Sequence, residues 1–106
     1  MTIQKIKENL VECCLNGNAK DFIPSLLSEK VKTEMPNKTR FYSFFKHMLN
    51  CAKLKSTGKW TLTIEETNWN KDTLAYNFYD EKHRYARVSI MVTEQNNKIT
   101  LETMPF

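Results

Sequence analysis

The stretch that decides the fold covers residues 59–102, which read KWTLTIEETNWNKDTLAYNFYDEKHRYARVSIMVTEQNNKITLE. Hydrophobic and polar residues alternate in it four times, over residues 60–65, 74–79, 86–93 and 98–102. A period of two predicts a β-strand with one buried face. Turn-forming residues separate the runs, and the pair Asn96-Asn97 favours a type I′ hairpin. Because short connections join antiparallel neighbours, we predict an antiparallel meander of these strands.

One face of this sheet is predicted to be apolar and therefore to need a cover. The side chains expected on that face are those of Trp60, Leu62, Ile64, Leu74, Tyr76, Phe78, Ala86, Val88, Ile90, Val92, Ile99 and Leu101. Upstream of the sheet, hydrophobic residues recur at three- and four-residue spacing over 3–14, 22–27 and 41–52, which predicts amphipathic helices. These helices are the only available cover, so they are expected to pack on one face of the sheet.

The third helix has the clearest pattern. Its predicted core face consists of Phe41, Phe44, Phe45, Met48, Leu49 and Ala52. Either Asn37 or Thr39 could cap its N-terminus. Residues 28–36 are polar, and around Val31 they leave room for one short strand.

The expected fold class is therefore α+β, with N-terminal helices packed on a curved antiparallel sheet of four strands or slightly more. At 106 residues, the chain has the length of one domain spanning residues 1–106.

Composition excludes several classes of protein. Two distant glycines, Gly17 and Gly58, cannot form a P-loop or a dinucleotide-binding loop. Three cysteines and two histidines show no metal-ligand spacing, so neither a metal nor another cofactor is expected. No apolar run could cross a bilayer, and the first residues do not resemble a secretion signal. An odd number of cysteines favours reduced thiols, so we expect a cytoplasmic protein.

The net charge of +4 leaves two interpretations of the surface. The lysines could simply form a solvated basic surface. Alternatively, Lys46, Lys53, Lys55 and Lys59 could bind nucleic acid, although no aromatic residues alternate with them as a stacking platform requires. We expect nucleic acid to be the less favoured partner.

The order of these elements resembles the nuclear transport factor 2-like superfamily, also described as SnoaL-like or as the cystatin-like cone. The resemblance begins with a helix ending at Gly17-Asn18, followed by Asp21-Phe22 and a leucine-bearing second helix. The phenylalanine-rich helix at 39–52 corresponds to the long helix of those domains. The final segments, 85–92 and 98–101, are similar to their closing hairpin. The alternative fold is a plain sandwich of helices on a sheet, without a pocket.

The resemblance implies a small molecule held in the hollow between sheet and helices. Its expected lining is Phe45, Trp60, Tyr76 and Val88. Enzymes of the superfamily project acids, histidines or tyrosines into this space, and the predicted inward face here offers Tyr76, with Thr103 beside Leu101 as a weaker candidate. Tyr76 is also readily explained as a core residue. Asp80 and His83 could form an acid–base pair at the end of the sheet, or simply part of a solvated turn.

The outward face of the predicted sheet carries several apolar side chains. The resemblance implies dimerisation through this face, with Tyr79, Tyr85, Met91 and Met104 as interface candidates. The alternative is an ordinary mixed surface.

Three functional hypotheses follow. The first is a non-enzymatic, homodimeric module that binds a small hydrophobic ligand or another protein. The second is an isomerase- or cyclase-type enzyme that acts on a small hydrophobic substrate. The third is a basic nucleic-acid adaptor.

Overall fold

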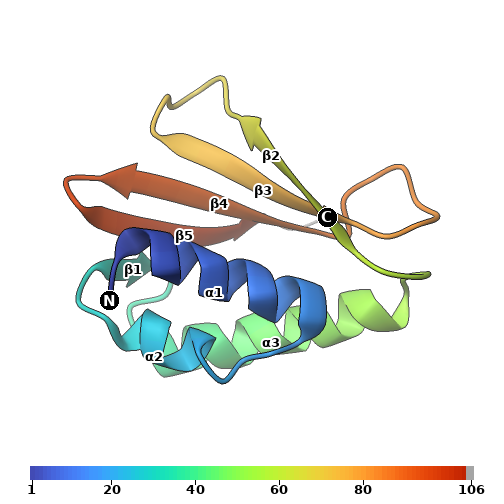
Figure 1. Ribbon diagram of the computed structural model, residues 1–106, viewed down its shortest axis with the longest axis horizontal. Coiled ribbons are helices and arrows are strands. Elements are labelled where there is room, and N and C mark those ends of the chain that lie inside the picture. The colour runs from blue at the N-terminus through green and yellow to red at the C-terminus, as the bar shows by residue number, and fades with distance from the viewer. Residues whose placement is uncertain (105–106) are drawn as a thin grey trace.

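The computed structural model describes residues 1–104 and confirms the α+β class. The helices are α1 (Ile3–Asn16), α2 (Phe22–Leu27) and α3 (Lys38–Leu54). The strands are β1 (Val31–Thr33), β2 (Thr61–Glu66), β3 (Thr73–Tyr79), β4 (Val88–Gln95) and β5 (Lys98–Met104). All three helices lie on one side of a single sheet (Figure 1). Among the described residues, no helix is both long and apolar enough to span a bilayer.

The sheet has five strands in the order β1-β5-β4-β3-β2. Strands β2 to β5 form the predicted antiparallel meander. The expectation of a purely antiparallel sheet is wrong at one edge, because β1 pairs parallel with β5, with Val31 opposite Ile99. The added strand pairs the edge of β5, whose backbone groups would otherwise be exposed.

The expected strong curvature is also wrong, since the sheet is not strongly curled around the helices (Figure 1). Tight curvature of a sheet usually requires glycine kinks or bulges. Both glycines of this chain, Gly17 and Gly58, lie outside the strands.

The predicted turn and cap chemistry is present. Asn96 and Asn97 both have positive φ, at 53° and 58°, as a type I′ hairpin requires. Gly17 ends α1 in the left-handed conformation. Of the two candidate caps of α3, Asn37 is the one whose side chain accepts a hydrogen bond, from the backbone N–H of Arg40 at 3.0 Å.

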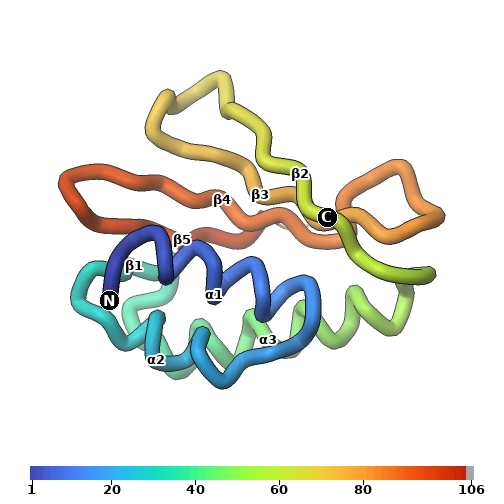
Figure 2. Tube along the Cα trace, in the orientation of Figure 1, coloured from blue at the N-terminus to red at the C-terminus, as the bar shows by residue number. Residues whose placement is uncertain are grey.

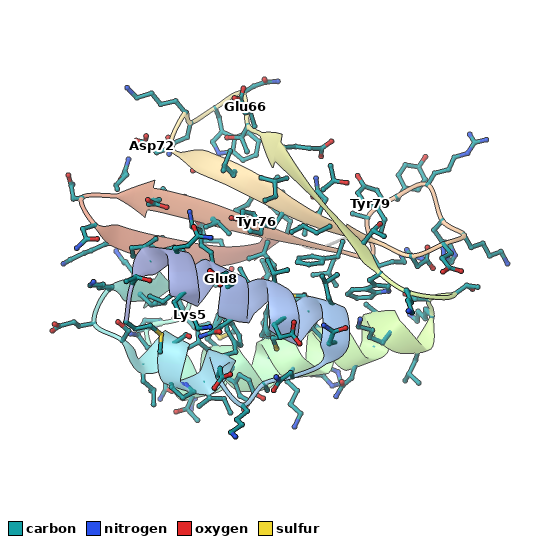
Figure 3. All side chains as sticks on the ribbon, viewed as in Figure 1. Lys5, Glu8, Glu66, Asp72, Tyr76 and Tyr79 are labelled. Atoms are coloured by element: carbon teal, nitrogen blue, oxygen red, sulfur yellow. The ribbon has the colours of Figure 1, made fainter. Side chains whose placement is uncertain are left out.

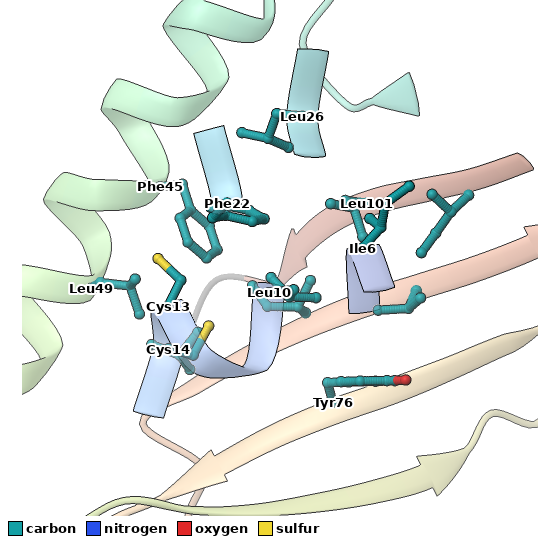
Figure 4. Close-up of a cluster of buried hydrophobic side chains, with 14 of the residues drawn as sticks. Ile6, Leu10, Cys13, Cys14, Phe22, Leu26, Phe45, Leu49, Tyr76 and Leu101 are labelled. Carbon is teal, nitrogen blue, oxygen red and sulfur yellow. The ribbon is translucent and has the colours of Figure 1, made fainter. Parts of the chain in front are cut away.

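The core is built from side chains of all three helices and the inner sheet face. Figure 4 shows Phe22 of α2 and Phe45 of α3 converging with side chains of α1. The two ring centroids are 5.2 Å apart, and Phe41 stacks on Phe45 at 6.0 Å. Phe44 is an exception to the predicted core face of α3, because 42% of it is exposed.

The inner sheet face is covered unevenly. Tyr76, Phe78 and Val88 are buried, but Ile64 on the same face is 49% exposed. Ile64 belongs to β2, the edge strand that projects away from the helix layer (Figure 1). The end of the β2–β3 hairpin, with Glu66 and Asp72, lies furthest from the helices (Figure 3).

Candidate functional site

A hollow of about 520 Å³ lies between α3, the loop that follows β1, and the ends of β4 and β5. It is lined by Glu34, Met35, Phe44, Met48, Arg87, Val88, Thr103 and Met104. Five of these eight side chains are apolar, and the volume falls in the range of small-molecule sites. The partial exposure of Phe44 is explained by this hollow, since its ring forms part of the wall.

Glu34 is fixed at one side of the hollow by β5. Its Oε1 accepts hydrogen bonds from the backbone N–H of Thr103 at 3.1 Å and from the Thr103 hydroxyl at 2.5 Å. The carboxylate is therefore held by the protein's own donors and shapes the wall.

Arg87 occupies a different position, just before β4. Its backbone N–H donates to the carbonyl of Phe78 at 2.7 Å, which anchors the main chain. The residue lines the main hollow and also a neighbouring one of about 170 Å³, which Cys51, Ala52 and Lys55 complete. Within residues 1–104 the two ion pairs are Lys7–Glu94 and His83–Asp80, so the Arg87 guanidinium belongs to neither.

The predicted pocket residues do not all line this hollow. Val88 does, whereas Phe45 lies in the core and borders a smaller hollow of about 150 Å³ beside α1. Trp60 and Tyr76 are packed in the core, 6% and 5% exposed. The Trp60 ring stacks under the ammonium group of Lys53, which lies 3.7 Å from the ring centroid.

Asp80 and His83, two of the candidate catalytic residues, are brought together. His83 Nδ1 lies 2.7 Å from Asp80 Oδ2. The Asp80 carboxylate also accepts hydrogen bonds from the backbone N–H groups of Thr57 at 2.9 Å, His83 at 2.8 Å and Lys82 at 3.3 Å. Its side chain is inaccessible to solvent, so the expectation of a solvated turn is wrong for Asp80.

These contacts make Asp80 a link between two loops. The connections 55–60 and 80–87 leave the helix layer and the sheet at the same end of the molecule (Figure 2). Burial opposes ionisation of Asp80, but the hydrogen bonds from His83, Thr57 and Lys82 outweigh it and hold its pKa well below the ordinary value. A carboxylate engaged in this way stabilises the loops.

Tyr76 lies apart from the Asp80–His83 pair. It is midway along β3, whereas Tyr79 lies near the end that leads to the pair (Figure 3). Four residues along a strand correspond to about 13 Å. Burial raises the pKa of Tyr76, which favours its neutral form. The three candidates therefore do not form one catalytic site.

The cysteines offer no activated nucleophile in the core. Burial raises the pKa of Cys13 to about 11 and raises that of Cys14 well above its ordinary value. Both thiols thus pack as small hydrophobic groups. Cys51 is exposed on α3, with its Sγ 3.6 Å from His47 Nε2. No group of three or more potential metal ligands occurs in the part of the chain that the structure describes.

The lysines proposed for nucleic acid differ in their engagement. Lys53 donates to the carbonyl of Leu15 at 3.1 Å while it packs on Trp60. Lys46, Lys55 and Lys59 are exposed. One member of the group is thus engaged within the protein.

The proposed interface residues are also placed differently from one another. Met91 lies on the outer sheet face and is only 7% exposed, while Tyr79 is half-buried. Tyr85 is 79% exposed in the loop before β4. Met104 is 41% exposed and lies at the main hollow.

Sequence reasoning missed most of the hollow's lining. Glu34 is in a polar segment without periodicity, and Arg87 alternates outward on the predicted strand. One lining residue, Thr103, is predicted to face inward, because it continues the alternation of Ile99 and Leu101. The apolar stripe of α3, which includes Phe44, is wider than the surface that the helix packs against its neighbours, and this width also indicates a hollow beside α3.

No family model, curated protein or solved structure is significantly similar to this chain.

Proposed function

We propose that this chain is a small, non-enzymatic binding domain of the nuclear transport factor 2-like type, and that it holds a small hydrophobic molecule beside α3. The observation that carries the proposal is the hollow of about 520 Å³ with Phe44, Met48 and Val88 in its wall. The strand β1 supports the proposed family, because the resemblance requires a strand between the second and third helices.

The chemistry of the hollow favours binding over catalysis. Of its two ionisable side chains, Glu34 is engaged by Thr103, and Arg87 carries a guanidinium, which is a poor general acid or base. The Asp80–His83 pair is not part of the hollow's lining. A proton-transfer enzyme needs an acid or base directed at the substrate.

The test uses N-phenyl-1-naphthylamine, a neutral fluorescent probe of apolar sites. We expect saturable binding to the wild type, and amide chemical-shift changes at residues 34–35, 44–48, 87–88 and 103–104. Phe44→Asp places a charge in the apolar wall and is expected to weaken binding about tenfold or more.

Leu54→Asp is the matched control. It adds the same charge to the same helix, but at a residue that is 87% exposed and outside the hollow's lining. Equal affinity of the two variants, or an absence of saturable binding by the wild type, would rule out this site.

A second candidate function is homodimerisation through the outer sheet face. The supporting observation is that the helices described within residues 1–104 all lie on the other side of the sheet, which leaves this face uncovered by them. Met91, 7% exposed, lies near its centre, opposite Ala75 on β3 and Glu102 on β5.

A further inference from the structure

We infer that the ligand of the hollow is a free anionic amphiphile, with an apolar body beside Phe44 and Met48 and a carboxylate bound by Arg87. This inference rests on the proposed function and adds the chemical class of the ligand. It depends on three features of the hollow: the residues that line it along α3, the position of Arg87, and the contacts of Glu34.

The two hollows are both lined by α3 and the residue that caps it. Phe44 and Met48 line the main hollow, and Cys51, Ala52 and the C-cap Lys55 line the smaller one. From Phe44 to Ala52 the helix rises about 12 Å, at about 1.5 Å per residue. A chain-like molecule of this length can contact both hollows.

The cation stands where the two hollows meet. Arg87 lines both of them, and Lys55 lines the second. Met35, Phe44 and Met48 line the main hollow only, whereas Lys55 lines only the neighbouring one. The main hollow is therefore mostly apolar, and two of the four residues that line the neighbouring hollow are basic. This is the complement of a molecule with an apolar tail and an anionic head.

A carboxylate is a head group that Arg87 can bind through two parallel hydrogen bonds. The guanidinium presents a planar set of donors that matches two carboxylate oxygens. Because Arg87 is half-buried, a bound charge there is less screened by solvent than one at a fully exposed site. Arg87 is also outside the ion pairs formed among residues 1–104, so binding would not first require breaking one of them.

The negative charge of Glu34 does not cancel this preference, because Glu34 is exposed and solvent screens its charge. Its Oε1 accepts both hydrogen bonds from Thr103, so the carboxylate is also held against β5. The net charge of +4 adds a general attraction for anions.

The experiment compares decanoate with 1-decanol, which share a chain and differ in the head group. Titration calorimetry of the wild type is expected to show decanoate binding about tenfold more tightly than decanol. Added salt should weaken decanoate binding and leave decanol binding unchanged.

Arg87→Gln is expected to abolish the preference for decanoate while retaining the affinity for decanol. Arg87→Lys, which keeps the charge, should restore part of the preference. Lys71→Gln is the matched control, since it removes a positive charge from the exposed β2–β3 loop. Circular dichroism confirms that each variant is folded.

The outcomes separate the two proposals. If decanol and decanoate bind equally well, or if Arg87→Gln keeps the preference, the anionic head group is wrong while the apolar hollow stands. If neither molecule binds, this inference fails, and the naphthylamine titration decides separately whether the proposed function stands. If decanoate binds only as a micelle or at a vesicle surface, the inference of a free monomeric ligand is overturned.

Discussion

Trp60 combines two opposing contributions to stability in one side chain. Its ring is buried and carries the ammonium group of Lys53, but its Nε1 is buried without a hydrogen-bond partner. A buried unsatisfied donor costs about 1–3 kcal/mol. Phenylalanine would remove that donor at the expense of some apolar area and of a weaker cation–π contact.

We expect Trp60→Phe to change the free energy of unfolding by less than about 1 kcal/mol, because these effects offset one another. Trp60→Ala is expected to cost about 3–5 kcal/mol, as for other buried aromatics. Urea denaturation measures both. A loss well above about 1 kcal/mol for Trp60→Phe would mean that the indole N–H is satisfied in solution.

Asp80 predicts a dependence of stability on pH. Its folded-state pKa is lowered, whereas an aspartate in an unfolded chain titrates near about 3.9. Its stabilising contribution is therefore fully present above that pH and is lost as the pH falls toward the folded pKa. Asp80→Asn should lower the urea midpoint at pH 7 and reduce the loss of stability between pH 5 and pH 2.

His83→Gln separates the donors of this site. It removes the side-chain contact to Asp80 and leaves the backbone donors of Thr57, Lys82 and His83 in place. We therefore expect His83→Gln to reduce the loss of stability between pH 5 and pH 2 by less than Asp80→Asn does. If the wild type and Asp80→Asn lost the same stability between pH 5 and pH 2, the role assigned to the carboxylate would be contradicted.

At the scale of elements, α3 shows why a periodic pattern predicts more core residues than the helix buries. Phe41, Phe45 and Leu49, four residues apart, are buried, while Phe44 is 42% exposed and Met48 is half-buried. The apolar stripe is wider than the surface that the helix presents to its neighbours. Its remaining width lines the hollow.

The two adjacent phenylalanines should consequently differ in their effect on stability. Phe45→Ala is expected to cost about 3–5 kcal/mol of unfolding free energy, because its ring is fully buried. Phe44→Ala should cost about 1 kcal/mol or less, since much of its ring is already exposed. Thermal and urea unfolding provide the measurement. Similar losses at the two positions would place Phe44 in the core.

The strand β1 shows the opposite limitation of sequence patterns. The meander from β2 to β5 is predictable, because each strand has several alternating residues and a short connection to the next. Val31–Thr33 is too short to display a period, and its partner Ile99 is far along the chain. Only the assembled fold brings the two together.

For the whole molecule, the candidate site could be predicted only in part. Val88 and the apolar face of α3 follow from periodicity, and both contribute to the hollow. Glu34 comes from a segment with no pattern of its own, and the alternation of residues 86–93 predicts that Arg87 points away from the core. Their meeting depends on where the β1–α3 loop and the start of β4 lie in three dimensions, which no local spacing encodes.

The outer sheet face provides the last prediction. Several of its polar groups are satisfied within the face: the Thr73 and Thr93 hydroxyls lie 2.7 Å apart, and Asn77 contacts both Glu65 and Ser89. A sheet-to-sheet dimer would therefore bury a face whose hydrogen bonds are largely internal, with Met91 at its centre. Such a face can be desolvated at lower cost than one with unsatisfied groups.

We expect sedimentation at micromolar concentration to give twice the monomer mass of 12.5 kDa. Ala75→Lys should yield a monomer of unchanged stability. Ala75 lies on β3 directly opposite Glu65 on β2, so the new ammonium has a partner within one protomer but obstructs a second sheet. Leu54→Lys, on α3, adds the same charge away from the sheet and should leave the dimer intact. A wild-type monomer, or a dimer that Ala75→Lys does not dissociate, would exclude this face as the interface.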